Sequence, residues 1–336
     1  MKVVVTGAAG MIGRKLVESL LSQPELADRD GKLAEIESLV GMDVVEPDPP
    51  LPDDSRLEFH TGEVSDEKLM RELIDGETDS IFHLAAVVSA QAEEDFDLGI
   101  RVNLGGVRAV LDACRALDHA PRLIFASSVA AFGGDMPDVI GDATTPTPGT
   151  TYGMTKVVGE YLVSDYTRKG FIDGRALRLP TIVVRPGRPN KAASTWASSI
   201  IREPLAGHEA VCPVTPDSKM WMCSPRRIVA AFRHAHELGP EAWGTQSGSH
   251  RAINLPGITA SVAETMAVLE ATGGAEVAAR VLFEHDSFIQ AIVDGWPNRF
   301  ETPRADAVGF TADEDLAEIV QVFVEDDLPR QAAYYD

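Results

Sequence analysis

The stretch Met1-Lys-Val-Val-Val-Thr-Gly-Ala-Ala-Gly-Met-Ile-Gly13 decides how this chain folds. Val3 to Val5 form a β-branched run that predicts a short buried strand, and residues 14–21 carry apolar side chains at helical spacing. Between them, glycines recur every three residues, at Gly7, Gly10 and Gly13. Such a turn presents backbone N–H groups and a helix N-terminus, so it predicts a pyrophosphate-binding site. An ordinary tight turn is the alternative, which the flanking strand and helix disfavour.

Length, composition and charge narrow the class of protein. The chain has 336 residues, which suits one large domain with a smaller one, and 44% of them are hydrophobic. Its formal net charge of −22 argues against nucleic acid and anionic membranes as partners. The sequence has neither an apolar run of membrane-spanning length nor a secretory pattern at its N-terminus. Its cysteines lack metal-site and disulfide spacing, so we expect a soluble cytoplasmic protein without a metal site.

A carboxylate follows the second predicted strand, which covers Ile36 to Met42 and ends at Asp43. In a dinucleotide-binding fold, an acidic residue at this place bonds the adenine ribose about 20 residues after the glycines. Asp43 lies 30 residues after Gly13, so we expect residues 22–32 to loop out of the unit. The alternative is a surface carboxylate. In the ribose role, Asp43 would repel a 2′-phosphate, and this predicts NAD in preference to NADP.

Strands and helices alternate through the first half of the chain. Further strands are predicted at Leu57–His60, Ser80–Val88, Arg122–Ser128 and Arg175–Val184, the last of them broken by Pro180, which indicates an edge or a bulge. The alternation predicts an α/β fold, a Rossmann-type doubly wound parallel sheet that binds ligands at the carboxyl ends of its strands. His83 lies inside an apolar run, and we interpret it as a core histidine.

The composition changes after Arg185. Four further helices are predicted at residues 195–205, 227–238, 262–271 and 313–324, separated by short strands around Val211, Trp221, Ile253 and Leu282. We expect a smaller α+β domain that binds substrate and acts as a lid. The predicted domains are residues 1–184 with a returning segment of about 224–257, and residues 185–223 with 258–336.

Tyr152 and Lys156 are four residues apart on a predicted helix, so they share one face. A tyrosine has an ordinary pKa of ~10, and a nearby ammonium group lowers it by favouring the phenolate. Ser128, at the end of a predicted strand, can hold a substrate hydroxyl beside the tyrosine. Together these groups are suited to take a proton from an alcohol while a hydride leaves for NAD.

These motifs together resemble the extended branch of the short-chain dehydrogenase/reductase superfamily, the NAD-dependent epimerase/dehydratase family. The matching pieces are Gly7-x-x-Gly10-x-x-Gly13, Asp43, His83-Leu-Ala-Ala86, Asn103, Ser127-Ser128, Tyr152-x-x-x-Lys156 and Leu177-Arg-Leu-Pro180. The resemblance covers nearly the whole first half and implies the fold described above. It also implies a homodimer formed through two helices, here around residues 99–117 and 152–169.

The resemblance implies a role for individual residues. Tyr152 would accept the proton, Lys156 would hold the nicotinamide ribose and tune Tyr152, and Asn103 would support the proton relay. Ser128, five residues before Gly133, would orient the substrate hydroxyl, while Ser127 would touch the cofactor through its backbone. The implied cofactor-binding residues are Gly7, Gly10, Met11, Ile12, Gly13, Asp43, Glu63, Val64, Leu84, Ala85, Ala86, Ser127, Tyr152, Lys156, Pro180 and Ile182. The implied substrate-binding residues are Ser89, Ser128, Tyr152, Arg185, Asn190 and Thr195.

The substrate class depends on the second half of the chain. Phe132 stands where many nucleotide-sugar enzymes of the superfamily have tyrosine, and residues 170–190 and 201–207 resemble its sugar-acid dehydrogenases. That likeness implies oxidation of the C2 hydroxyl of a four-carbon sugar acid. Arg185 is then a candidate for gripping the carboxylate, and bracing its own turn is the alternative role. A nucleotide-sugar epimerase or dehydratase and a non-catalytic dinucleotide sensor remain alternative functions.

Overall fold

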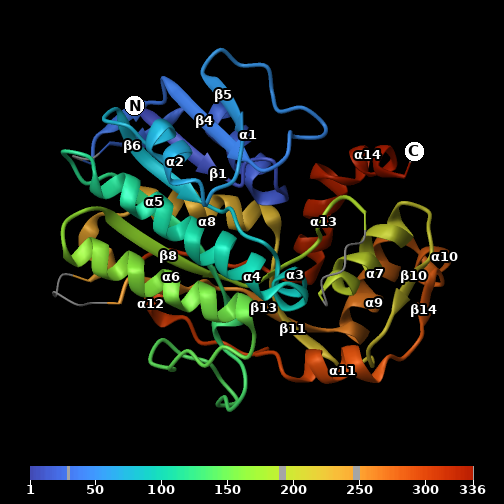
Figure 1. The fold of residues 1–336 in the computed structure, drawn as a ribbon. Helices are drawn as coiled ribbons and strands as arrows, with labels where there is room; N and C mark the ends of the chain where they lie inside the picture. Colours follow the sequence, from blue (N-terminus) through green and yellow to red (C-terminus); the bar gives the residue numbers. More distant parts are fainter. Residues whose placement is uncertain (29–30, 189–193, 245–249, 336) are drawn as a thin grey trace. The chain divides into compact units, whose positions relative to one another are not determined.

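The computed structural model describes residues 1–28, 31–188, 194–244 and 250–335 (Figure 1). The chain packs into two compact units. The first unit comprises Met1–Ala131, Pro148–Arg178 and Val229–Asn254. The second comprises Phe132–Thr147, Leu179–Ile228 and Leu255–Asp336. No helix within the described residues combines the length and the apolar character that crossing a lipid bilayer requires.

The first unit is built on a seven-stranded sheet with the order β12-β8-β7-β6-β1-β4-β5. These strands are β1 (Lys2–Thr6), β4 (Ser38–Asp43), β5 (Leu57–Thr61), β6 (Thr78–His83), β7 (Arg122–Ser128), β8 (Asp173–Leu179) and β12 (Ala252–Asn254). Strand β1 lies parallel between β4 and β6, with Val4 opposite Val40 on one side and Ile81 on the other. The order of strands reverses beside β1, which confirms the predicted doubly wound topology and marks the edge where such folds bind ligands.

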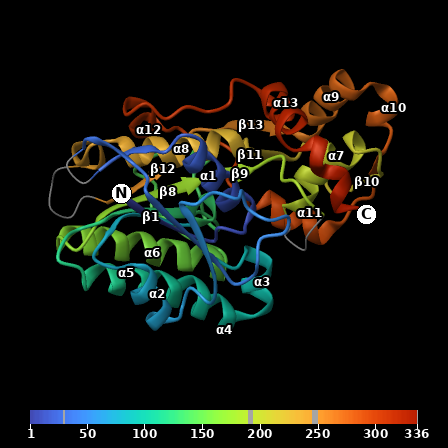
Figure 2. The ribbon, with the colours of Figure 1, turned by 90° about the horizontal axis from the view of Figure 1, so that it is seen from above.

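Helices cover both faces of this sheet, which explains why its central strands are apolar throughout. Val3, Val4 and Val5 are all fully buried, as a strand packed on both faces requires. Figure 2 shows α1 and α8 on one side of the sheet and α2, α5 and α6 on the other. Their bounds are α1 Met11–Ser22, α2 Glu67–Leu73, α5 Gly106–Arg115, α6 Thr151–Arg168 and α8 Pro225–Glu237. Between β6 and α5 lie α3 (Ser89–Glu94), α4 (Phe96–Gly99) and the π-helical turn η1 (Ile100–Gly105).

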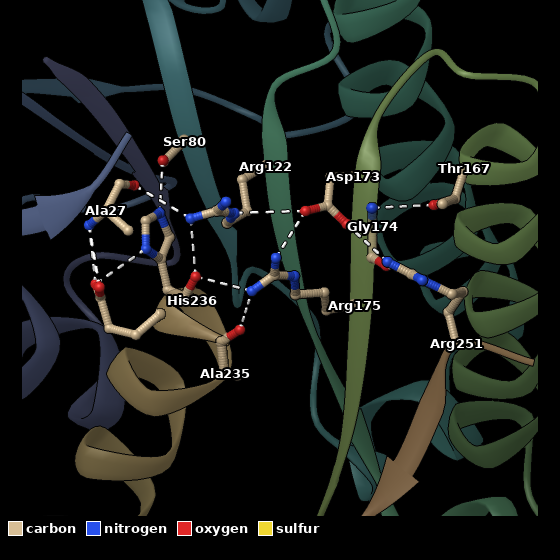
Figure 3. Close-up of polar contacts among 11 residues, drawn as sticks. Ala27, Ser80, Arg122, Thr167, Asp173, Gly174, Arg175, Ala235, His236 and Arg251 are labelled. Atoms are coloured by element: carbon tan, nitrogen blue, oxygen red, sulfur yellow. Dashed lines mark hydrogen bonds and ion pairs between the residues drawn. The ribbon is translucent and has the colours of Figure 1, made fainter. Parts of the chain in front are cut away.

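Buried arginines hold the C-terminal end of α8 against the amino edge of the sheet (Figure 3). Arg122 and Arg175 each donate to the carbonyl oxygen of His236, at 2.9 and 2.8 Å. Asp173 accepts from Arg175 and from Arg251, each at 2.7 Å. Cations at a helix C-terminus satisfy its last carbonyl groups and complement the helix dipole. This network lies at the amino ends of the strands, whereas the glycine turn lies at their carboxyl ends.

The extra residues that we expected to loop out after α1 form a short antiparallel hairpin, in which β2 (Glu25–Ala27) pairs with β3 (Leu33–Glu35). The prediction for Pro180 was wrong. Pro180 does not form a bulge in the sixth strand: β8 ends at Leu179 and the chain leaves the sheet. The next strand, β9 (Thr181–Ile182), pairs with β11 in the second unit. Proline cannot donate to the ladder, so it suits the point where one sheet ends.

The second unit holds two small sheets, β13-β11-β9 and β10-β14. Their strands are β10 (Ala210–Cys212), β11 (Lys219–Cys223), β13 (Ile258–Ser261) and β14 (Val281–Phe283), together with β9. The helices are α7 (Thr195–Leu205), α9 (Val262–Gly273), α10 (Ala275–Ala278), α11 (Ser287–Asp294), α12 (Pro303–Ala307), α13 (Leu316–Asp326) and α14 (Leu328–Gln331). Trp196, Ile200, Met222 and Phe323 belong to its apolar core. The four predicted helices are all present, and the strand around Ile253 is β12 of the first unit's sheet.

The loop of residues 132–147, which we expected in the first unit, packs within the second. Ile140 pairs with Phe300 as an isolated bridge, and the Phe132 ring lies 5.9 Å from the Phe300 ring. Phe300 also stacks on Trp221, with ring centroids 5.1 Å apart. Aromatic contacts far apart in sequence therefore determine where this loop belongs, and local pattern does not reveal them.

Candidate active site

The glycine turn after β1 requires its glycines for close backbone contact. Gly7 has a φ of +77°, and a Cβ there would lie 2.7 Å from the Ala85 amide nitrogen. A Cβ on Gly13 would lie 2.0 Å from the Gly7 carbonyl oxygen. Gly10 is the N-cap of α1, and no side chain of the described residues caps that helix. The amides of Gly7, Ala8 and Gly10 donate to backbone carbonyl groups, and that of Ala9 donates to Asp43. The backbone N–H groups of the first residues of α1 therefore suit an anion such as pyrophosphate.

Asp43 lies at the end of β4, where its carboxylate meets the glycine turn. Its Oδ2 accepts from the Ala9 amide at 3.1 Å, and its Oδ1 accepts from the Val44 amide at 2.7 Å. The hairpin absorbs the extra residues between the glycines and β4, so the greater sequence separation does not displace Asp43. It occupies the place expected of a ribose-binding carboxylate.

Two more loops complete the carboxyl edge on either side of β1. After β6, the Leu84 amide donates to the Thr6 carbonyl at 3.1 Å, and the Ala85 amide donates to the Thr6 hydroxyl at 3.3 Å. Ala86 and Ser89 follow, with Ser89 at the first position of α3. After β5 come Glu63, which is exposed, and Val64, which is buried. Met11 and Ile12 begin α1.

Asn103 lies in η1, where its side chain braces the loop after β6. Its Oδ1 accepts from the Val87 amide at 2.8 Å, and its Nδ2 donates to the Val87 carbonyl at 3.2 Å. Nδ2 also lies 3.4 Å from the Thr155 hydroxyl on α6. π-Helical turns are frequent at functional sites. The contacts seen here join the loop to α6, and the relay role of Asn103 stays a prediction.

Tyr152 and Lys156 lie one turn apart on α6, as predicted. The Lys156 ammonium is 5.4 Å from the centre of the Tyr152 ring and donates to the Ala126 carbonyl at 2.8 Å. The Lys156 residue is only 4% exposed. Burial lowers the pKa of Lys156 to about 8, and the charge of Glu160 opposes that shift. A protonated Lys156 beside the phenol would favour the phenolate form of Tyr152.

The two serines at the end of β7 have different surroundings. The Ser127 hydroxyl is buried and donates to the Glu160 carboxylate on α6. The Ser128 hydroxyl is half-buried and accepts from the Ala130 amide at 3.1 Å. The Ser127 hydroxyl is thus bonded inside the protein, whereas Ser128 lies at the strand end, and its role in holding the substrate hydroxyl stays a prediction.

His83 is a core residue, as expected. Its Nδ1 lies 2.7 Å from the Thr6 hydroxyl, and its ring stacks on Phe125 at 5.7 Å. Burial, together with the charge of Lys156, lowers the pKa of His83 to about 3. His83 is therefore neutral at physiological pH and cannot serve there as a titrating acid or base.

The remaining predicted residues lie in the second unit. Pro180 and Ile182 flank the start of β9, and Thr195 begins α7. Arg185 donates from Nε to the Ile182 carbonyl at 3.0 Å and from Nη2 to the Ser194 hydroxyl at 3.1 Å. These bonds are the turn-bracing contacts that we had weighed as the alternative for Arg185. Asn190 lies outside the described residues.

Sequence reasoning missed Glu160 and its bond to Ser127. Glu160 continues the four-residue spacing of Tyr152 and Lys156, which was the available signal, and its other partner is Arg178 in the quoted Leu177-Arg-Leu-Pro180 motif. The pairing itself depends on β7, β8 and α6 meeting in space. As for metals, the described residues contain no group of three or more His, Cys, Asp or Glu side chains that could hold an ion.

Sequence comparison decides which family this arrangement represents. The profile of the NAD dependent epimerase/dehydratase family matches residues 3–222. The chain belongs to this family. Its membership confirms the resemblance drawn from the motifs, and NAD is the cofactor that the glycine turn and Asp43 fit. The glycine turn and Asp43 both belong to the first unit.

Several full-length relatives of this epimerase/dehydratase family member are similar to it. A D-erythronate dehydrogenase of Cupriavidus necator is 47% identical over 326 residues, which cover 97% of this chain and 98% of the relative. A D-erythronate dehydrogenase of Haemophilus influenzae is 42% identical over 337 residues, covering 98% and 100%.

Solved structures confirm the fold. A nucleoside-diphosphate-sugar epimerase from Agrobacterium tumefaciens has a TM-score of 0.91 and 39% sequence identity, covering 98% of this chain and 95% of its own. An L-threonine dehydrogenase of Cupriavidus necator in its holo form has a TM-score of 0.80 at 23% identity, covering 96% and 98%. At that identity the likeness concerns the fold alone.

Proposed function

We propose that this protein oxidises the C2 hydroxyl of D-erythronate to 2-dehydro-D-erythronate with NAD. Two full-length relatives at 47% and 42% identity carry the name D-erythronate dehydrogenase, and this similarity carries the choice of substrate. The buried Lys156 ammonium, 5.4 Å from the Tyr152 ring, carries the choice of reaction. This spacing suits removal of a proton from an alcohol.

In the proposed mechanism, Ser128 donates a hydrogen bond to the substrate oxygen and places the hydroxyl beside Tyr152. Tyr152 in its phenolate form takes the hydroxyl proton as the carbonyl forms. Lys156 favours that phenolate through its positive charge and bonds the nicotinamide ribose. When bound, NAD supplies the acceptor for the C2 hydride. Asn103 supports the proton relay from its place in η1, beside Thr155 of α6.

The cofactor is held by residues from the carboxyl edge of the sheet. The N–H groups at the start of α1, those of Met11, Ile12 and Gly13, would bind the pyrophosphate, with Gly7 and Gly10 allowing its close approach, and Asp43 would bond the adenine ribose. Residues 63–64, residues 84–86 and the backbone of Ser127 line the rest of the site. Pro180 and Ile182 are further proposed cofactor-binding residues. In this role Asp43 selects NAD over NADP.

The substrate carboxylate requires a cation, because the protein as a whole is strongly acidic. Arg185 is the proposed partner, since a guanidinium can bond a carboxylate through two parallel hydrogen bonds. Asn190, Thr195 and Ser89 are proposed to read the other hydroxyls. Two nitrogens of Arg185 already brace its turn, so the carboxylate must compete with or add to those bonds.

A second candidate is a nucleotide-sugar epimerase or dehydratase, favoured by the name of the 39% identical solved structure. An epimerase returns the hydride to its substrate, so the reduced cofactor does not accumulate. A silent dinucleotide sensor is the third alternative, and the presence of Ser128, Tyr152 and Lys156 together argues against it.

We further propose that the protein is a cytoplasmic homodimer that acts in carbohydrate metabolism. Phe96 on α4 and Tyr161 on α6 are 58% and 56% exposed, and these are large apolar surfaces to leave in water. Pairing of the α5 and α6 region with a second copy would cover them. The three cysteines are free and buried, as suits a reducing compartment.

The proposed function is tested with a panel of four- to six-carbon aldonates, each incubated with NAD or NADP and read by absorbance of the reduced cofactor. Net NADH formation with D-erythronate is expected, and activity with NADP should be much lower. Conversion of a nucleotide sugar without net NADH would support the epimerase instead. Binding of NAD without conversion of any compound would support the sensor.

A further inference from the structure

A buried acidic side chain continues the line of functional residues on α6. Tyr152, Lys156 and Glu160 follow one another at four-residue spacing and share one face of the helix. Glu160 is 0% exposed. The helix approaches β7 closely at this point, because a Cβ on Gly159 would lie 2.6 Å from the Phe125 ring. Glu160 is therefore held against the sheet, one turn beyond Lys156.

Glu160 joins the strand ends beneath the proposed catalytic pair. Its Oε1 accepts from the Ser127 hydroxyl and from Arg178 Nε at 2.8 Å, while its Oε2 accepts from Arg178 Nη2 at 2.7 Å. Arg178 also donates to the Asn254 side chain at 3.3 Å. His250 Nε2 lies 3.7 Å from Oε2. The carboxylate thus ties α6 to β7, β8 and β12.

A contribution to stability is a weak explanation for the buried ion pair between Glu160 and Arg178. Removing two charges from water costs about as much as their mutual attraction returns, and apolar side chains often replace such pairs without loss. A carboxylate fixed one helical turn from a buried ammonium has a further effect, which is electrostatic. At low local dielectric its charge acts strongly on Lys156.

Three titratable groups among the described residues interact with Lys156: His83, Tyr152 and Glu160. His83 on β6 is neutral because burial lowers its pKa to about 3. On α6, Tyr152 adds negative charge only as the phenolate, and Glu160 opposes the effect of burial on the pKa of Lys156. From β8, Arg178 is bonded to the Glu160 carboxylate and carries the opposite charge. The charge of Glu160 therefore favours the ammonium form of Lys156, against the effect of burial.

We propose that Glu160 is a positioning residue, the counter-ion that holds Lys156 in its ammonium form and Ser127 in place, and that it acts on the reaction through Lys156. This inference rests on the proposed roles of Tyr152 and Lys156 and extends them. Without the carboxylate, two buried cations, Lys156 and Arg178, would both lose its negative charge. Lys156 would then lose its proton at lower pH, and the neutral amine would no longer favour the Tyr152 phenolate.

The test is Glu160→Gln, which keeps the size of the side chain and removes its charge. Profiles of kcat/KM and of NAD affinity, the latter by quenching of tryptophan fluorescence, are measured from pH 6 to 10. The alkaline decline of both should move to lower pH by about one unit, so that kcat/KM falls by about tenfold at pH 9 but only by about twofold at pH 7. Glu160→Asp should restore the parent profile. Asp165→Asn, which removes an exposed charge from the same helix, is the matched control and should leave it unchanged.

Arg178→Gln should shift the pH profile in the opposite direction. Removing the cation bonded to Glu160 leaves the carboxylate charge uncompensated, so the alkaline decline should move to higher pH. It also decides the matter if Glu160→Gln does not fold, as judged by circular dichroism. A Glu160→Gln profile that keeps the parent pH dependence, with only a uniform loss or a lower melting temperature, would overturn the proposal. If the parent oxidises no sugar acid, the proposed substrate fails, but the pH dependence of NAD affinity still tests Glu160.

Discussion

The carboxylate of Asp43 accepts a hydrogen bond from the backbone N–H of Ala9 at 3.1 Å, so the end of β4 is tied directly to the glycine turn. One side chain thereby shapes the pyrophosphate loop and presents negative charge beside it. An ionised carboxylate has about four lone-pair sites, so this bond leaves acceptors for ribose hydroxyls. The relationship leads to a prediction on cofactor choice.

Replacing Asp43 by Asn or Ala should weaken NAD binding and narrow the preference over NADP. Hydrogen bonds to a charged group contribute about 1.5–3 kcal/mol, so we expect a loss of about tenfold or more. Asp43→Asn keeps an acceptor for the Ala9 amide, whereas Asp43→Ala removes it. A greater loss of NAD affinity in Asp43→Ala therefore measures how much the bond to the turn contributes. Titration of both cofactors checks this. A parent protein that prefers NADP would exclude the ribose role.

Replacing Tyr152 by Phe should abolish turnover while NAD still binds. A positioned acid–base group contributes about 10²–10⁴-fold, and the phenol is the proposed proton acceptor. Tyr166→Phe is the matched control, because it removes another hydroxyl from α6 that is bonded to Asp112 at 2.7 Å. Steady-state NADH formation and direct NAD titration separate rate from binding. Activity within a few-fold of the parent would rule out Tyr152 as the base.

Replacing Arg185 by Ala should raise the Michaelis constant for the sugar acid by about tenfold or more, with NAD affinity unchanged. The control is Ser194→Ala, which removes one bracing bond of Arg185 and keeps its charge. A similar rise in both variants would show that Arg185 acts by bracing its turn. An unchanged Michaelis constant in a folded Arg185→Ala would move the carboxylate site elsewhere.

Acidification should destabilise the protein through its buried histidines. Burial lowers the pKa of His236 to about 4. In the folded protein its Nε2 lies 2.7 Å from the Ser80 hydroxyl. Below its ordinary pKa of about 6.5, the unfolded state binds a proton that the folded state does not, so stability falls as pH falls from 6.5 towards 4. Between pH 7 and pH 5 this histidine should cost about 2 kcal/mol, and His83 should add a similar loss.

Urea unfolding of the parent and of His236→Gln at both pH values measures this contribution. The variant should be less stable at pH 7, because it loses packing around Ser80, and should show a smaller decrease on acidification. His285→Gln, at an exposed position, serves as the control and should follow the parent. An equal decrease in the parent and in His236→Gln would mean that His236 does not drive the acid sensitivity.

Much of the nucleotide site could be predicted because its signals are local. The glycine spacing, the carboxylate at the end of β4 and the four-residue step from Tyr152 to Lys156 are visible in short windows of sequence. The exit at Pro180 was anticipated as an irregularity, but its nature was missed. A proline shows that a ladder is interrupted, and it does not show which sheet the chain joins next.

The sequence by itself determined the doubly wound fold, the place of the glycine turn and the common face of Tyr152 and Lys156, because periodicity and backbone sterics act between near neighbours. Only the tertiary structure decided that residues 132–147 pack with Phe300, that Ser127 is bonded inward while Ser128 is not, and that Glu160 meets Arg178 one turn beyond Lys156. Those contacts join residues far apart in the chain. Burial and charge pairing select them, and both exist only once strands and helices have been brought together.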